Sequence, residues 1–286
     1  MTAAIRQSTC SALVEDFSLE MTGKDVAVVG QASAPDGTRI NITYLEHESF
    51  QQRIEAIRAV REAGFVPVPH ISARRLHSRH ALEEFLAALQ AEGASELVFV
   101  VGGDPSVPQG PYEDALAVIR SGLLKAYGVR EVGIAGYPEG HPTIPESHLW
   151  GALEDKAAEL GRQGLAGCII TQFGFDVDAA VAWIERVRSQ GVDLPIRVGV
   201  PGPASVGRLV RYAARFGAGT SAGIARKYGF SLTNLLGTAG PGRFLRDLAG
   251  LYDPGRQGSV GVHFYTFGGL AATTGWISQF KEGGAA

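Results

Sequence analysis

The chain has 286 residues, of which 45% are hydrophobic and 19% charged, so it can bury a large core and is not expected to be disordered. Its formal net charge is −3 and its basic runs, such as Arg74-Arg75 with Arg79, are short, which argues against a nucleic-acid partner. No signal peptide or apolar run of about 18 residues is present, and Cys10 and Cys168 suggest neither a disulfide framework nor a zinc site. We therefore expect a soluble, cytoplasmic protein without a membrane partner or a bound metal.

Short apolar runs recur along the chain at a spacing of roughly 30 residues, as strand–helix repeats do. Most of the runs are nearly continuous, which is typical of parallel strands that are covered on both faces. The predicted strands are residues 18–21, 39–45, 66–72, 96–102, 131–137, 168–173, 196–200 and 260–266.

Amphipathic segments separate these runs, and several of them stop at a glycine. The predicted helices include residues 51–63, 81–92, 179–190 and 206–216. Residues 25–30 are interpreted as a short helix, and residues 220–254 as an elaborated crossover with two helices. A strand followed by a helix, repeated about eight times, predicts an α/β protein with a (β/α)8 barrel. We expect one domain over residues 1–286, with residues 1–16 as an N-terminal extension; an open doubly wound sheet is the alternative fold.

Polar residues gather where the predicted strands end. In a parallel barrel these ends meet at one rim, which is where active sites form. The residues are Glu20, Thr43, His70, Asp104, Tyr137, Glu139, His141, Gln172 and Tyr265. The set favours an enzyme without reference to any family.

Each of these residues also has a structural interpretation. Asp104 before Pro105 is suited to a turn or a helix cap, His70 to a buried core histidine, and residues 139–142 to a turn. Tyr212 lies on a helix face where packing would explain it. Glu20 is harder to explain, because a carboxylate between Leu19 and Met21 in a buried strand costs several kcal/mol unless it is paired or functional.

The glycine-rich segments do not indicate a nucleotide fold. Residues 101–104 (Val-Gly-Gly-Asp) lack the three-glycine dinucleotide spacing, and no Walker loop is present. Residues 199–203 (Gly-Val-Pro-Gly-Pro) are stiffened by proline and are interpreted as a rigid loop at the barrel mouth. A Rossmann dehydrogenase is therefore not expected.

Residues 133–142 are Gly-Ile-Ala-Gly-Tyr-Pro-Glu-Gly-His-Pro, and residues 170–176 are Ile-Thr-Gln-Phe-Gly-Phe-Asp. Three shorter segments lie in order with them, at residues 69–70 (Pro-His), 100–104 (Val-Val-Gly-Gly-Asp) and 263–266 (His-Phe-Tyr-Thr). The set resembles the Pro-His, Arg-Gly-Asp, Tyr-Pro-Glu-x-His-Pro, Thr-Gln-Phe-x-Phe-Asp and His-Phe-Tyr-Thr segments of the methylenetetrahydrofolate reductase family. The resemblance covers most of residues 18–267, and the combination of the two long segments is specific.

The resemblance implies a (β/α)8 barrel that reduces 5,10-methylenetetrahydrofolate to 5-methyltetrahydrofolate, with FAD as cofactor and NADH or NADPH as co-substrate. It implies that Glu20 is the general acid that helps to open the five-membered ring of the substrate. Asp104 would lie beside the flavin and the pterin as a second catalytic carboxylate, and Gln172 and Tyr212 would contact the substrate. The implied flavin contacts are Thr43, His70, Gly103, Asp104, Tyr137, His141 and Lys156. The implied ligand is a tetrahydrofolate derivative, and family members are often homo-oligomers.

Three departures from the family pattern suggest a divergent short form. Residues 19–23 are Leu-Glu-Met-Thr-Gly where the family usually has Glu-Phe-Phe-Pro-Pro, Gly102 replaces the arginine of the Arg-Gly-Asp turn, and the Lys156 segment is interpreted as extended by an insertion through residues 159–164. One alternative is therefore a flavin-independent reductase that transfers hydride directly from NADH to folate. A second is a folate-dependent methyl or one-carbon transferase, or a demethylase partner, on the same barrel. A third is a non-catalytic pterin-binding subunit.

Overall fold

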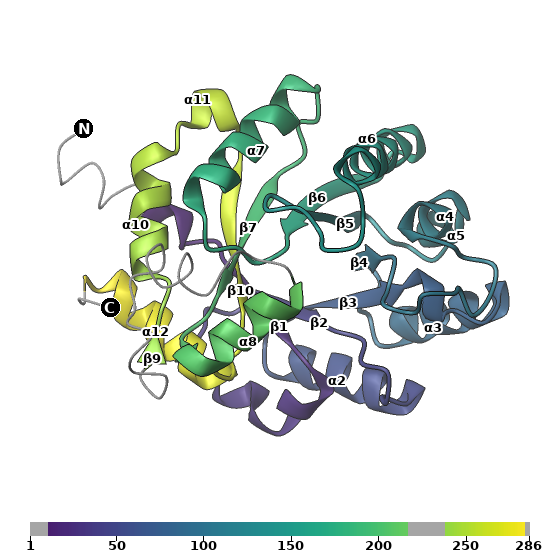
Figure 1. The fold of residues 1–286 in the computed structure, drawn as a ribbon. Coiled ribbons are helices and arrows are strands. Elements are labelled where there is room, and N and C mark those ends of the chain that lie inside the picture. The colour runs from purple at the N-terminus through teal and green to yellow at the C-terminus, as the bar shows by residue number, and fades with distance from the viewer. Residues whose placement is uncertain (1–10, 217–237, 284–286) are drawn as a thin grey trace.

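A computed structural model describes residues 11–216 and 238–283 of the chain. Eight parallel strands form a closed barrel in the order β1-β10-β7-β6-β5-β4-β3-β2 (Figure 1). They are β1 (Ser18–Met21), β2 (Arg39–Ile42), β3 (Val66–Ser72), β4 (Leu97–Val101), β5 (Glu131–Gly136), β6 (Ala166–Thr171), β7 (Ile196–Pro201) and β10 (Val260–Tyr265). The predicted (β/α)8 barrel is confirmed, and the open doubly wound sheet is excluded.

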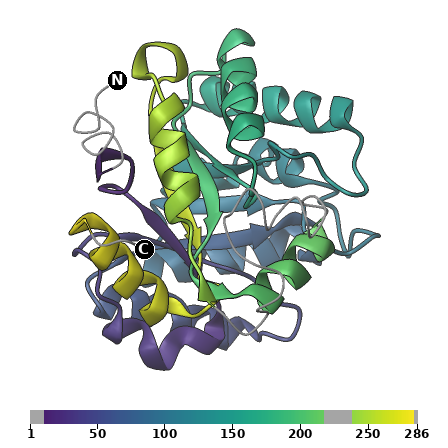
Figure 2. The ribbon, with the colours of Figure 1, turned by 60° about the vertical axis from the view of Figure 1, so that its left-hand side comes forward.

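The barrel closes where its first and last strands pair. Leu19 lies beside Phe264 and Glu20 beside Tyr265 in the parallel register of β1 and β10. Figure 2 shows the purple N-terminal strand and the yellow C-terminal strand meeting. Residues from the two ends of the chain therefore share one part of the barrel.

Helices surround the barrel, and several begin at side-chain caps. Ser49 and Gln52 form a capping box at the start of α2, and Asp176 caps α7. The helices are η1 (Gly23–Gln31), α2 (Phe50–Glu62), η2 (Ala73–Arg75), α3 (Arg79–Ala91), α4 (Ala115–Arg120), α5 (Leu123–Ala126), α6 (Glu146–Gln163), α7 (Val177–Ser189), α8 (Val206–Phe216), α10 (Gly242–Leu251), α11 (Pro254–Gln257) and α12 (Leu270–Lys281). A small antiparallel pair, β8 (Ala204–Ser205) and β9 (Thr238–Ala239), lies outside the barrel sheet. None of the described helices is both long and apolar enough to cross a membrane.

Most predicted elements match in position, and the differences lie at their ends. Strand β2 stops at Ile42, three residues earlier than expected, and β6 begins at Ala166, two residues earlier. The segment expected to be extended beyond Lys156 is the regular second half of α6, which ends at Gly164 in a left-handed conformation. The expected crossover over 220–254 lies partly outside the described residues; within the described part, α10 is one of its helices.

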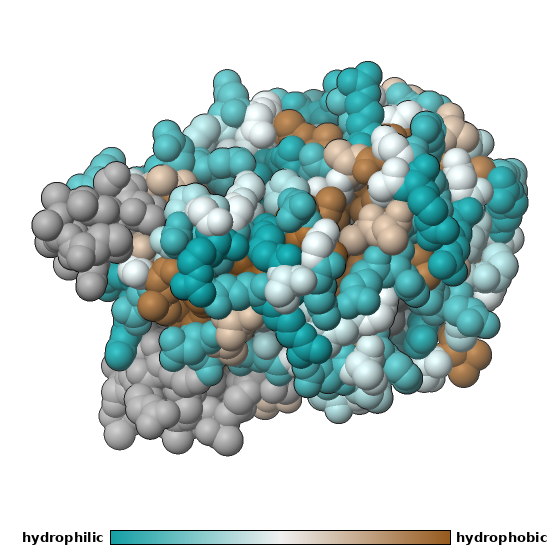
Figure 3. Space-filling model, turned by 90° about the horizontal axis from the view of Figure 1, so that it is seen from above, coloured by the Kyte–Doolittle hydropathy of each residue, from teal (hydrophilic) through white to brown (hydrophobic). Residues whose placement is uncertain are grey.

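Two apolar clusters fill the fold. The larger contains the alternate strand residues that face the helices, for example Leu19, Val98 and Val132. The smaller lies inside the barrel and is made of Val68, Phe99, Cys168 and Ile170. The surface seen in Figure 3 is mainly hydrophilic with small, scattered hydrophobic areas, as expected when the apolar sides of the helices pack inward.

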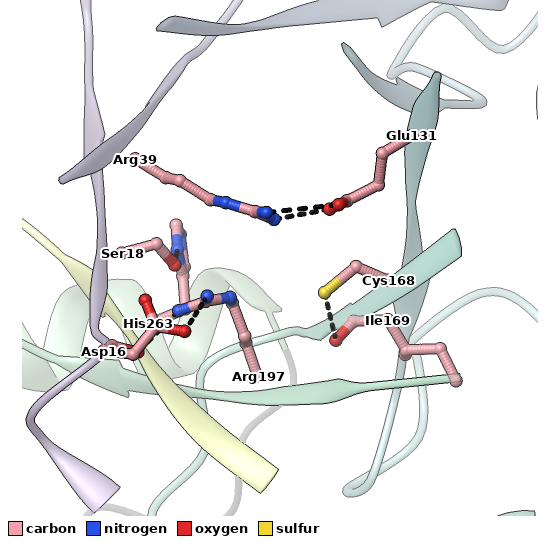
Figure 4. A network of polar contacts seen from close by, with 8 residues as sticks. All are labelled: Asp16, Ser18, Arg39, Glu131, Cys168, Ile169, Arg197 and His263. Carbon is pink, nitrogen blue, oxygen red and sulfur yellow. Dashed lines mark hydrogen bonds and ion pairs between the residues drawn. The ribbon is translucent and has the colours of Figure 1, made fainter. Parts of the chain in front are cut away.

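The interior at the N-terminal ends of the strands is charged. Arg39 of β2 reaches across the barrel and pairs through two hydrogen bonds with Glu131 of β5 (Figure 4). Arg197 of β7 donates to the backbone oxygen and to the carboxylate of Asp16, each at 2.7 Å. Burial raises the pKa of the Cys168 thiol to about 11, so this residue is a neutral thiol. We call these five residues the lower layer; the cavity beside them, at about 20 Å³, is large enough for about one water.

Candidate active site

Glu20 lies at the C-terminal end of β1, and 21% of its side chain is exposed. His263 of β10 is buried behind it, with Nε2 3.8 Å from Glu20 Oε2. Among the described residues, this nitrogen has no hydrogen-bond partner. The other ring nitrogen of His263, Nδ1, is 2.8 Å from Ser18 Oγ (Figure 4). When Ser18 donates to Nδ1, the imidazole proton is on Nε2 and faces the carboxylate, so the three residues form a polar chain from the barrel interior to the rim.

His70 lies inside the barrel on β3, next to this chain. Its ring packs on Phe99 with a centroid separation of 4.7 Å, and its Nε2 is 3.4 Å from Asn41 Nδ2. Burial lowers the pKa of His70 to about 4, although the carboxylate of Glu20 acts to raise it. The imidazole is therefore neutral at pH 7, and it brings no positive charge to the site.

Tyr265 of β10 forms one wall of the same interior. Its hydroxyl donates to the backbone oxygen of Thr171 at 3.0 Å. Its ring lies on Gly199, where a Cβ would come within 2.8 Å of the ring. Burial raises the pKa of Tyr265 well above its ordinary value, and the charges of Glu20 and Tyr137 act in the same direction. The phenol therefore stays protonated.

Gln172 follows β6 at the rim, and its side-chain oxygen accepts a hydrogen bond from the backbone of Phe173 at 3.0 Å. Phe173 contacts Tyr265 and Phe267, with ring centroids 5.3 and 4.9 Å away. Tyr212 of α8 stacks on Phe267 at 4.0 Å with the rings nearly parallel. Gln172 and Tyr212 are thus joined through an aromatic cluster at the rim, and Tyr212 has the packing contact that its helix position suggested.

Asp104 lies in the loop after β4, and 70% of its side chain is exposed. It does not cap the next helix, because Asp114 caps α4. The carboxylate of Asp104 is bound by the guanidinium of Arg75. Gly103 has a φ of 95°, and a Cβ there would lie 2.1 Å from Ser72 Oγ, so the turn requires glycine.

Tyr137 and His141 lie in the β5–α6 loop, with their rings edge to face at 5.4 Å. They line a cavity of about 520 Å³ between this loop, α6 and α7, together with Trp150 and Trp183. Burial raises the pKa of Tyr137 and lowers the pKa of His141. Glu139 accepts hydrogen bonds from two backbone N–H groups just before α7, so this turn joins the β5–α6 loop to the β6–α7 loop.

Thr43 and Lys156 occupy different surroundings. Thr43 follows β2 at the rim, and its hydroxyl donates to the backbone oxygen of Met21 at 3.0 Å. Lys156 is buried in α6 and faces Asp114 at the start of α4. Burial lowers the pKa of Lys156 to about 8, although Asp114 acts to raise it.

The barrel therefore brings most of the candidate residues to one end, but in two groups. Glu20 and His70 interact electrostatically with each other, and His70 also with His263. Tyr265 interacts in the same way with Glu20 and with Tyr137. Asp104, Gln172, Tyr212, Thr43 and His141 lie at strand ends or in the loops and helix beyond them, and Lys156 is buried in the helix layer. Sequence reasoning missed Ser18, Asn41, Arg75 and His263 as site residues. The signal for His263 was a polar residue between the apolar residues Val262 and Phe264 of a buried strand.

Comparisons with known proteins agree with this architecture. A family profile described as methylenetetrahydrofolate reductase matches residues 29–217. The 5,10-methylenetetrahydrofolate reductase of Pectobacterium carotovorum subsp. carotovorum is 26% identical over 176 residues, which cover 61% of this chain and 57% of that protein. Methylenetetrahydrofolate reductase 2 of Saccharomyces cerevisiae is 39% identical over 69 residues, 24% of this chain and 11% of that protein.

A solved structure supports the fold. Dihydropteroate synthase from Thermus thermophilus superposes with a TM-score of 0.50 at 13% sequence identity, with 94% of each chain covered. The aligned part spans little more than half of the bacterial reductase and a small part of the yeast protein. Because the family profile matches well over half of this chain, the chain belongs to the methylenetetrahydrofolate reductase family.

Proposed function

We propose that the protein reduces 5,10-methylenetetrahydrofolate to 5-methyltetrahydrofolate, with NADH or NADPH as the hydride donor and Glu20 as the general acid. The proposal is supported by membership of the reductase family. The observation that carries it is the Glu20 carboxylate, which is partly exposed at the rim and faces a buried imidazole nitrogen that has no hydrogen-bond partner among the described residues. Such a nitrogen beside a carboxylate is unusual in a protein interior and is typical of a functional site.

The reaction needs one proton and one hydride. A proton from the Glu20 carboxyl group goes to the nitrogen that leaves the methylene carbon, the carbon–nitrogen bond breaks, and an iminium ion remains. Hydride then adds to the iminium carbon and gives the methyl group, while the donor becomes NAD⁺ or NADP⁺. His263 Nε2 is 3.8 Å from the carboxylate, beyond hydrogen-bond distance, and we infer that it acts on Glu20 electrostatically.

The other rim residues have roles that follow from their chemistry. The carboxylate of Asp104 is exposed at the rim and can stabilise positive charge on the iminium. Gln172 offers an amide for hydrogen bonds to the pterin, and Tyr212 lies in an aromatic cluster suited to stack on a flat ring. We propose both as substrate contacts.

Family members generally use a flavin, and the residues expected to bind FAD can be tested against its diphosphate. The set lacks an exposed cation: Lys156 and His70 are buried, His141 has a lowered pKa, and Gly102 replaces the family arginine. A diphosphate is bound by cations or by a row of backbone N–H groups. The expected residues therefore supply no charged group for the diphosphate, and on this ground we propose direct hydride transfer from the nicotinamide to the folate.

Two measurements test the function. We expect the purified protein to be colourless, without flavin absorbance, and to oxidise NADH or NADPH when methylenetetrahydrofolate is added. A yellow protein with one FAD per chain would overturn direct transfer but not the reductase activity. Methyl transfer from 5-methyltetrahydrofolate without nicotinamide oxidation would instead favour the transferase. If the protein binds folate but shows no turnover in either assay, the proposal that it is an enzyme would be wrong.

A further inference from the structure

We propose that Arg75 is a positioning residue for Asp104, and that its guanidinium fixes the orientation in which the carboxylate meets the folate. This inference rests on the proposed function, because it concerns the same rim. It assigns a role to the Arg74-Arg75 pair, which stands out in the sequence as a basic run.

The first observation is the burial of Arg75. It belongs to η2, directly after β3, and only 7% of its side chain is exposed. An arginine is rarely buried to this extent without a partner, because its charge must be compensated. The ring of Tyr44 lies 5.6 Å from the guanidinium, and Glu46 is 3.9 Å away, too far for a hydrogen bond. Asp104 is therefore the main partner of this buried charge.

The second observation is the geometry of the pair. Arg75 donates from Nε to Asp104 Oδ1 at 3.0 Å, and from Nη2 to Oδ1 and Oδ2 at 2.7 and 2.8 Å. Contacts to both oxygens fix the plane of the carboxylate as well as its position. The arginine is buried whereas the aspartate is mostly exposed, so Arg75 holds the carboxylate from the protein side and leaves it accessible at the rim.

The third observation is that Arg74 holds the backbone around Asp104. Its N–H donates to the backbone oxygen of Gly102 at 2.9 Å, and its Nη1 donates to that of Pro105 at 3.2 Å. Its Nε donates to the backbone oxygen of Glu113 at 2.7 Å, at the far end of the loop. The loop is thus held by Arg74 and the carboxylate by Arg75.

The turn next to Asp104 departs from the family pattern. The turn has Gly102 where the family has arginine, and a Cβ on Gly102 would meet nothing within 4 Å. In this chain the arginine beside Asp104 is Arg75, which follows the neighbouring strand β3. Its charge is used to orient the aspartate, because three hydrogen bonds of its guanidinium converge on that carboxylate.

A double-mutant cycle tests the proposal, with Arg75→Gln, Asp104→Asn and the double variant compared by kcat, KM for methylenetetrahydrofolate and melting temperature. If Arg75 acts through Asp104, Arg75→Gln lowers kcat about tenfold in the native background and less than about twofold in the Asp104→Asn background. Arg75→Lys keeps the charge but loses the two-oxygen contact, so it should fall between the native protein and Arg75→Gln. Arg79→Gln is the matched control, since this exposed arginine pairs along α3 with Glu83, and we expect native kinetics.

Equal loss of kcat in both backgrounds would overturn the proposal, as would a lower melting temperature with unchanged kcat. The second result would make the pair purely structural. The dissociation constant of 5-methyltetrahydrofolate, measured by calorimetry for the same four proteins, gives a second value for the coupling. If the native protein binds folate but does not reduce it, the proposed function fails, and the coupling in that constant still decides whether Arg75 acts through Asp104.

Discussion

The two ends of the barrel interior are both polar, but they are built differently. In the lower layer each charged side chain has an ion-pair partner, Arg39 with Glu131 and Arg197 with Asp16. At the upper end the described residues include two buried side-chain atoms without a hydrogen-bond partner, His263 Nε2 and Ser72 Oγ. The first faces Glu20, and the second lies under the Gly103 turn next to Asp104.

We interpret the paired groups of the lower layer as serving stability, and we propose that the unpaired groups of the upper end serve function. A fully paired layer can be explained by folding alone, because breaking a buried pair is costly. Unpaired buried groups cost stability, and we propose that their position at one end of the barrel reflects a ligand or a reaction there. Each prediction below changes one end and asks whether the other responds.

The largest effect is expected for Glu20→Gln, which removes the proposed acid. Turnover should fall about a thousandfold, because a positioned acid contributes roughly 10²- to 10⁴-fold. NADH binding and the melting temperature should stay near native values, since the amide has the size of the carboxylate. Glu62→Gln, at an exposed residue of α2, is the control. Normal turnover of Glu20→Gln would make the acid assignment wrong.

The next largest effect is a loss of stability at acidic pH, which we attribute to His70. Burial lowers its folded-state pKa to about 4, from an ordinary 6.5, so only the unfolded chain takes up this proton between those values. The free energy of unfolding should therefore fall as pH drops from about 6.5 to 4, by roughly 3 kcal/mol in total. Urea unfolding at pH 7 and pH 4.5 measures this, and His70→Asn should remove most of it. If the stability of His70→Asn depended on pH as strongly as that of the native protein, the lowered pKa of His70 would be contradicted. The control is His148→Asn, at an exposed histidine of α6.

A smaller effect is expected in the lower layer for Glu131→Gln. It leaves the Arg39 guanidinium inside the barrel with a weaker partner. Because both side chains are partly exposed, we expect a loss of about 2 kcal/mol in the free energy of unfolding, less than for a fully buried pair. Urea unfolding measures the loss, and kcat at 25 °C should not change. The exposed pair Glu96–Arg130 gives the control Glu96→Gln, with little expected effect. A large fall in kcat would show that the two ends are not independent.

The smallest effect is expected for Asp104→Asn at the upper rim. Turnover should fall about tenfold, because the iminium loses a facing negative charge. The melting temperature should fall slightly, because the buried Arg75 loses its charged partner and the amide offers one accepting oxygen instead of two. Asp155→Asn, exposed on α6, controls for the loss of a charge. If activity and melting temperature fell in parallel, the role of Asp104 would be structural and not catalytic.

The strands could be predicted from the sequence because each is a short apolar run. Residues 18–21 and 66–72 match β1 and β3 at both ends. The end of β2 was wrong because Tyr44 and Leu45 continue the apolar pattern after the barrel pairing stops; the ring of Tyr44 instead packs under Arg53 at 4.0 Å. The start of β6 was missed because Ala166 and Gly167 have small side chains that do not indicate a strand, although both residues pair with β5.

The candidate site could be predicted in part. Residues at strand ends, such as Glu20 and Gln172, follow from the fold class, because a parallel barrel collects those ends. The Arg75–Asp104 contact could not be predicted, since it joins η2 to the loop after β4, 29 residues away, and depends on side-chain direction. The burial of Lys156 was missed for the same reason, because its helix face is set by packing against α4.

The pairing of β1 with β10 has a consequence for how the molecule matures. Ser18 and His263, which are 245 positions apart, meet only once the last barrel strand has docked beside the first. Closing such a long loop is slow and entropically unfavourable, and it must precede formation of the Glu20–His263 pair. Catalytic competence should therefore arise late in folding, and an incomplete chain emerging from the ribosome would not yet carry it.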